Sequence, residues 1–162
     1  MTARFVRAGE IDDATRIAEI YNQGIADRVA TFETDLRDAS QIAQWFTNNY
    51  PVFVAGEEDR VMAYAAAFPY RTRPCYDGVR EFSIYVAREG RGKGFGRAAL
   101  TALIDASKAR GWWKLVSRIF PENEASLRLC DTLGFRRVGI YEKHGRLDGV
   151  WRDVVIVEKL LV

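Results

Sequence analysis

Three glycines within five residues, Gly92, Gly94 and Gly96, separate two segments of different character. The segment before them, VREFSIYV at 79–86, is rich in β-branched and aromatic residues and predicts a strand. The segment after them, RAALTALIDASKARG at 97–111, repeats its apolar residues at helical spacing and ends on a glycine. The chain must therefore accommodate a strand, a cationic glycine loop and a helix in immediate succession.

Glycine is a poor helix former, so its concentration at a helix start needs a reason. One explanation is a tight turn that closes a sheet. The other is a loop whose backbone amides face an anion, because the first amides of a helix lack acceptors and carry a partial positive charge. GKGFGR lacks the third glycine of a dinucleotide-binding fingerprint, and GFGRA lacks the Gly-Lys-Ser/Thr ending of a P-loop. The residues alone leave both explanations open.

The remaining segments alternate between helix and strand patterns. Apolar residues at helical spacing predict further helices at 12–25, 39–49 and 122–134. Strand patterns cover 3–8, 52–56, 61–68, 112–120, 135–142 and 150–161. We expect connecting loops at 25–38, 69–78 and 143–149. This order predicts a mixed α/β or α+β fold in which helices cover a sheet.

The composition is ordinary for a globular protein of 162 residues, and we expect a single domain over 1–162. No apolar run suits a membrane span, and the first residues show no signal-peptide core, so we expect a cytoplasmic protein without membrane contact. A net charge of +2 argues against nucleic-acid binding. Cys75 and Cys130 fit no metal-ligand spacing and His144 is the single histidine, so we expect free thiols and no metal site.

The segment RGKGFG at 91–96 matches the pattern Arg/Gln-x-x-Gly-x-Gly/Ala of the GCN5-related N-acetyltransferases. The match extends to EFSIYV before the loop, to NEAS at 123–126 and to LGF at 133–135. The chain resembles this family over nearly its whole length. The resemblance implies the family's α+β fold: a twisted, mostly antiparallel sheet of about seven strands, splayed between strands 4 and 5 and covered by about four helices.

In that family the loop amides hold the pyrophosphate of acetyl-CoA, which the resemblance implies as co-substrate here, without a metal. It also implies that the amide of Val86 polarises the thioester carbonyl and that Asn123 contacts the pantetheine arm. Asn123 has a second explanation, since asparagine is a favoured helix N-cap, and both roles can hold. The cofactor-binding residues implied in this way are Tyr85, Val86, Ala87, Arg91, Gly92, Lys93, Gly94, Phe95, Gly96, Arg97 and Asn123.

A narrower resemblance concerns the substrate. Several segments resemble phosphinothricin-type acetyltransferases, whose relatives act on methionine sulfone, methionine sulfoximine and arsinothricin. These segments are EFSIYV (81–86), IYNQGI (20–25), ATFE (30–33), FPYRTRPCYDG (68–78), KHG (143–145) and WRDV (151–154). The resemblance implies direct transfer, within a ternary complex, to the amine of a small amino-acid analogue with an anionic or oxygen-rich side chain. It also implies a homodimer.

The same resemblance assigns roles to individual residues. Glu81 is implied as the general base, although from the residues alone it is a surface carboxylate paired with Arg80 or another cation. His144 is implied as a proton relay or substrate contact. The guanidinium groups of Arg71 and Arg73 would offer planar donors to an oxyanion, and the alternative is two solvated arginines. The implied substrate-binding residues are Phe32, Glu33, Arg71, Arg73 and Tyr76.

Two features depart from the family. Cys130 stands where many members carry a tyrosine that protonates the departing thiolate, and core packing is the simpler explanation for this cysteine. The segment between His144 and Trp151 is also longer than in the phosphinothricin-type enzymes. Two other functions stay open: transfer to a different amine, such as a polyamine, an aminoglycoside or a protein N-terminus, and non-catalytic binding of coenzyme A as a sensor.

Overall fold

The computed structural model describes residues 3–162, so the first two residues of the expected domain 1–162 lie outside the described residues. Its strands form one seven-stranded sheet in the order β1-β2-β3-β4-β5-β7-β6. The strands are β1 (Arg4–Ala8), β2 (Val52–Glu57), β3 (Arg60–Pro69), β4 (Val79–Val86), β5 (Lys114–Ile119), β6 (Arg136–Leu147) and β7 (Val150–Leu160). The helices are α1 (Ala14–Asp27), α2 (Ala39–Thr47), α3 (Phe95–Ala109) and α4 (Glu124–Thr132).

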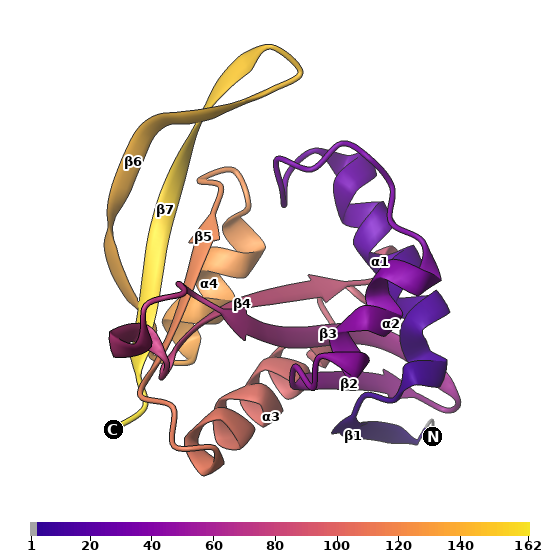
Figure 1. The fold of residues 1–162 in the computed structure, drawn as a ribbon. Helices are drawn as coiled ribbons and strands as arrows, with labels where there is room; N and C mark the ends of the chain where they lie inside the picture. Colours follow the sequence, from indigo (N-terminus) through magenta and orange to yellow (C-terminus); the bar gives the residue numbers. More distant parts are fainter. Residues whose placement is uncertain (1–2) are drawn as a thin grey trace.

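The sheet is antiparallel except where β4 and β5 run side by side, joined by the crossover helix α3. This parallel pairing covers only Val79–Glu81 of β4 and 114–116 of β5. Beyond it the two strands diverge: β1 to β4 cross the view of Figure 1, whereas β5, β7 and β6 rise steeply away from them. The predicted splay between strands 4 and 5 is confirmed.

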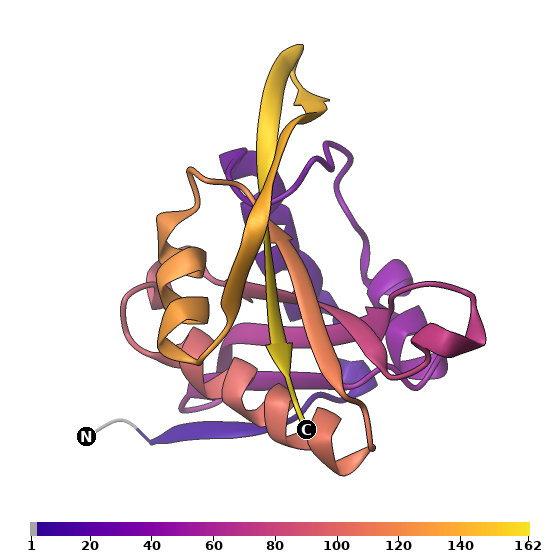
Figure 2. The ribbon, with the colours of Figure 1, turned by 90° about the vertical axis from the view of Figure 1, so that its left-hand side faces the viewer.

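Helices cover both faces of the β2–β4 part of the sheet (Figure 2). Tyr85 stacks on Tyr21 of α1, whereas the next residue, Val86, lies against Gly96 of α3. Because successive side chains of a strand point to opposite faces, α1 and α3 lie on opposite sides of the sheet. Their buried residues meet the sheet in one continuous core. Within residues 3–162, no helix is long and apolar enough to span a membrane.

The expectation of a loop over 143–149 is wrong. Strand β6 continues to Leu147, β7 begins at Val150, and only Asp148 and Gly149 form the turn. Both turn residues have positive φ angles, 51° and 78°, as a two-residue hairpin turn requires. The Asp-Gly pair is the signal that would have predicted this hairpin, which Figures 1 and 2 show extending beyond the rest of the sheet. His144 therefore lies on a strand.

Candidate functional site

The glycine loop presents backbone amides at the start of α3. Gly92 and Gly94 have φ angles of 75° and 89°, a region that side chains disfavour. The first backbone bond of the helix runs from the amide of Ala98 to the carbonyl oxygen of Gly94, at 3.1 Å. The amides just before Ala98 therefore point out of the helix end, where they can donate to an anion.

Ion pairs anchor this loop to the rest of the protein. Asp27, the last residue of α1, bonds Arg88 at 2.7 Å and Arg91 at 2.8 Å, and these bonds, that of Arg88 first, hold the pKa of Asp27 below its usual value. Glu89 bonds Arg16 at 2.7 Å, which lowers the pKa of Glu89 to about 2. The segment that leads into the glycines is therefore held by ion pairs to α1.

A cavity of about 500 Å³, here called the glycine-loop cavity, opens beside the loop. Ala87 and Lys93 do not line it: Ala87 is fully buried, and the carbonyl oxygen of Lys93 accepts a hydrogen bond from Arg4. The other residues expected to bind the cofactor do line it, namely Tyr85, Val86, Arg91, Gly92, Gly94, Phe95, Gly96, Arg97 and Asn123. Sequence reasoning missed Gly24, Val29 and Ile84 in the same wall.

The structure tests the simpler explanations that the sequence offers for Asn123 and Cys130, namely helix capping and core packing. The Asn123 side chain accepts a bond from the amide of Ser126 at 3.3 Å, so its role as the N-cap of α4 is confirmed. Cys130 is completely buried in the core, and burial raises the pKa of its thiol to about 12. The core-packing explanation of Cys130 is confirmed.

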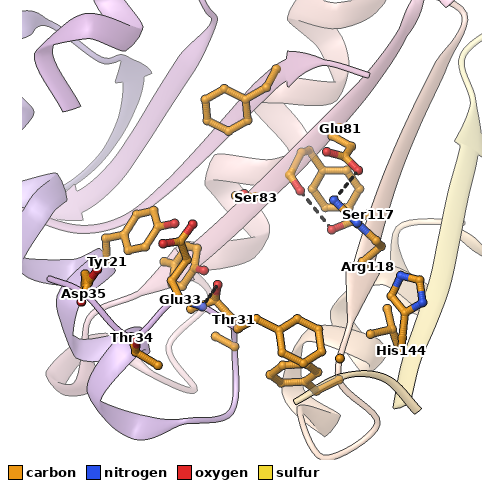
Figure 3. A pocket seen from close by; sticks show the side chains of 18 residues that line it. Tyr21, Thr31, Glu33, Thr34, Asp35, Glu81, Ser83, Ser117, Arg118 and His144 are labelled. Carbon is orange, nitrogen blue, oxygen red and sulfur yellow. Dashed lines mark hydrogen bonds and ion pairs between the residues drawn. The ribbon is translucent and has the colours of Figure 1, made fainter. Parts of the chain in front are cut away.

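A second cavity of about 670 Å³, the central cavity, lies where β4 and β5 separate (Figure 3). Its wall includes Glu81, Arg118 and His144 on one side and the α1–α2 connection on the other, which spans 28–38 rather than the expected 25–38 because α1 continues to Asp27. It shares Tyr85 and Ala30 with the glycine-loop cavity. A group held at the glycine loop and a molecule in the central cavity can therefore meet beside Tyr85.

The backbone of β4 points an amide into the gap at this junction. The amide of Ala87 donates to the carbonyl oxygen of Met62 on the β3 side, at 2.7 Å. Amides of adjacent residues in a strand point to opposite edges, so the amide of Val86 faces the other side, where β5 has diverged. Among the described residues no β5 pairing extends past Glu81, so this donor has no strand partner there.

Glu81 forms an ion pair with Arg118 of β5, with 3.0 Å between nitrogen and oxygen (Figure 3). Arg80, the partner considered from the sequence, instead stacks on the ring of Trp112 at 4.2 Å. Sequence reasoning missed Arg118. The strand pairing explains its position, because Glu81 lies opposite Val116, and Arg118 is two residues further on the same face.

The 28–38 connection closes the opposite wall of the central cavity. Asn22 of α1 holds it by donating to the Arg37 carbonyl oxygen and accepting from the Arg37 amide, at 2.9 and 2.8 Å. Within it, Glu33 pairs with Arg37 at 2.6 Å. Phe32 packs edge-on against Phe120, with 4.7 Å between ring centres, and both rings line the cavity. Phe32 is therefore both a wall residue and part of a small apolar cluster.

The loop at 69–78, which carries Arg71 and Arg73, lies outside the central cavity. Arg71 and Tyr76 line a third cavity of about 500 Å³, the outer cavity, which shares Glu81, Arg118 and His144 with the central cavity. They are thus not in one cavity with Phe32 and Glu33, and within residues 3–162 Arg73 lines none of the three. The described part of the chain also contains no group of three or more His, Cys, Asp or Glu side chains suited to a metal ion.

Comparison with known proteins agrees with this geometry. The chain matches the acetyltransferase (GNAT) family over residues 16–135. A phosphinothricin N-acetyltransferase of Streptomyces coelicolor is 32% identical, over 96% of this chain and 95% of its own, and an L-amino acid N-acyltransferase of Escherichia coli is 34% identical, over 98% and 92%. The solved structure of a GNAT superfamily phosphinothricin acetyltransferase from Sinorhizobium meliloti, in complex with acetyl-CoA, has a TM-score of 0.90 and 31% identity, covering 97% of this chain and 88% of the other. The chain belongs to the acetyltransferase (GNAT) family and is an N-acetyltransferase that uses acetyl-CoA.

Proposed function

We propose that the single domain of this protein acetylates the amine of a small amino-acid analogue of the phosphinothricin, methionine sulfone or arsinothricin type, by direct transfer. The observation that carries the proposal is the junction of the two cavities at Tyr85 and Ala30, with the carboxylate of Glu81 on the wall of the central cavity. The names of the relatives from Streptomyces coelicolor and Escherichia coli support an amino-acid-like acceptor.

The glycine-loop cavity fits the diphosphate of acetyl-CoA, which supplies an activated acetyl thioester. The free amides at the start of α3 and the nearby guanidinium groups of Arg91 and Arg97 are the donors that a diphosphate requires. A Cβ on Gly96 would lie 3.0 Å from Cγ2 of Val86, so glycine allows the helix end to approach β4 closely. Asn123 lines the same cavity, and we assign it the contact with the pantetheine arm.

Residues of the central cavity supply the general base and the proton transfers for acetyl transfer. Glu81, five residues before Val86 on β4, accepts a proton from the bound ammonium group directly or through one or two waters, which frees the nitrogen lone pair to form a bond to the carbonyl carbon. The amide of Val86 donates to the carbonyl oxygen as negative charge develops there. The carbon–sulfur bond breaks, and the sulfur leaves with the electron pair as a thiolate. The nitrogen must also lose a second proton to become an amide, and this proton goes to the departing thiolate or to His144, which lies on the same wall as Glu81 and can also contact the substrate.

Recognition of the substrate side chain is part of the proposal. Phe32 forms an apolar wall and Glu33 is the second carboxylate for the amine. Arg71 and Tyr76 offer donors from the outer cavity, which is continuous with the central cavity at Glu81 and His144, and Arg73 belongs to the same loop. The arginines of this loop favour an acceptor with an anionic side chain, whereas the carboxylates of the central cavity would also suit a polyamine, so the substrate panel below includes one.

We further propose that the enzyme is a cytoplasmic homodimer whose task is resistance to such analogues. The β6–β7 hairpin exposes large apolar side chains, including Ile140, Val150 and Trp151, as partner surfaces do. The unpaired thiols of Cys75 and Cys130 suit a reducing compartment. Light scattering at several protein concentrations would test the dimer, and a concentration-independent monomer mass would contradict it.

Thiol release from acetyl-CoA with a panel of phosphinothricin, methionine sulfone, arsinothricin, spermidine and a short peptide tests the function. We expect turnover with the amino-acid analogues. Glu81→Gln should lower kcat by about 10²- to 10⁴-fold while calorimetry still detects acetyl-CoA binding. The control is Glu58→Gln, in the exposed turn between β2 and β3. Binding of coenzyme A without turnover of any amine would instead identify a sensor, and wild-type turnover by Glu81→Gln would exclude Glu81 as the base.

A further inference from the structure

We infer that Arg118 binds the α-carboxylate of the acceptor while its ion-pair partner Glu81 receives the α-amine, so that the pair recognises the zwitterionic head of a free amino acid. This inference rests on the proposed function and deepens it. The nitrogen and oxygen of the pair are 3.0 Å apart, and both side chains line the central cavity (Figure 3). Arg118 comes from β5 and Glu81 from β4, so the pair spans the start of the splay.

The covalent structure of the substrate class dictates this arrangement. In an α-amino acid the amine and the carboxylate share one carbon, so their charged atoms are separated by about 3 Å. Wherever Glu81 receives the amine, the α-carboxylate must lie next to it. The spacing of Glu81 and Arg118 matches this separation, with the opposite charge at each end.

The charges that line the central cavity indicate that Arg118 binds the α-carboxylate. Among residues 3–162, Arg118 is the only lysine or arginine that lines it. Its carboxylates are Glu33, which pairs with Arg37, together with Asp35 and Glu81. An α-carboxylate that entered this cavity without a cation would meet repulsion from all three and would lose its hydration without compensation.

Arg118 retains N–H donors for the α-carboxylate while it is bonded to Glu81. A guanidinium carries five N–H donors, and the bond to Glu81 engages one of its terminal nitrogens. The side chain is 56% exposed, compared with 30% for Glu81, so much of the guanidinium group is left uncovered by the protein. A carboxylate is the acceptor that this planar edge fits best.

The test compares phosphinothricin and methionine sulfone with their α-carboxamides, which keep the amine and the side chain but lack the α-carboxylate charge. We expect the wild type to prefer the acids. Arg118→Ala should lower kcat/KM for the acids by about 10- to 100-fold, mainly through KM, and change kcat/KM for the carboxamides little. Arg118→Lys should restore part of the preference. Arg137→Ala, which removes an exposed arginine paired with Asp131, is the matched control and should behave as the wild type.

The ratio of acid to carboxamide turnover is measured within each variant, so a general loss of folded enzyme does not affect it. Equal losses of both substrates in Arg118→Ala would show that Arg118 only positions Glu81, and would overturn the inference. A wild type that acetylates acids and carboxamides equally would overturn it while leaving the proposed function intact. A wild type that acetylates none of these four compounds would remove the proposed function itself.

Discussion

The hydroxyl of Ser117 donates a 3.0 Å hydrogen bond to the carbonyl oxygen of Phe82, one residue beyond the last backbone pair between β4 and β5. A side chain thus replaces the next ladder bond at the point where the strands separate. The Phe82 carbonyl group is partly buried. Without the Ser117 hydroxyl it would have no hydrogen-bond partner, and an unpaired buried carbonyl destabilises the fold. The opening of the central cavity therefore begins at a defined residue.

Ser117→Ala should lower the free energy of unfolding by about 1 kcal/mol, because the Phe82 carbonyl loses its partner. Urea denaturation followed by circular dichroism measures this. Ser117→Thr keeps the hydroxyl in a β-prone residue and is the control, expected to remain near the wild type. Equal stability of Ser117→Ala and the wild type would show that solvent replaces the hydroxyl at this carbonyl.

Gly94→Ala should raise the KM for acetyl-CoA. Gly94 has a φ angle of 89° at the N-cap of α3, so a side chain there strains the loop that presents the amides. Gly149→Ala, in the β6–β7 turn with a φ angle of 78°, is matched for backbone strain but lies outside the glycine-loop cavity. Both variants should lose about 1 kcal/mol of stability. A rise in KM of the same size in both would mean that the loop has no special role in binding.

Ionisation of Glu89 should make the free energy of unfolding depend on pH in the acidic range. Its folded-state pKa is lowered from 4.5 to about 2, chiefly by the bond from Arg16. The ionised pair therefore stabilises the fold fully above about pH 4.5, and this contribution is lost as the pH falls toward 2. The difference in urea midpoint between the wild type and Glu89→Gln should shrink between pH 6 and pH 3. Added salt should also reduce it, because the pair is partly exposed. A constant difference across this range would contradict the prediction.

Local patterns were sufficient for much of the fold. The β-prone run, the glycines and the helical spacing predicted β4, the loop and α3 in order, although the helix begins at Phe95 rather than at 97. Asn123 was correctly predicted as an N-cap, because capping depends on residues a few positions apart. The two strands of the β6–β7 hairpin were predicted, but the extension of β6 over 143–147 was missed because these residues, KHGRL, alternate too weakly to suggest strand continuation.

The sequence by itself determined the element order, the amide-rich loop and the resemblance to the family, since each depends on neighbouring residues and their spacing. Only the tertiary structure decided which charges meet. The bond of Arg118 to Glu81 and the Ser117 bond to Phe82 follow from the register and divergence of β4 and β5, which α3 separates in the chain, and the placing of Arg71 and Phe32 in different cavities follows from where their loops pack. Strand register depends on long-range packing of the whole sheet, which no local pattern specifies.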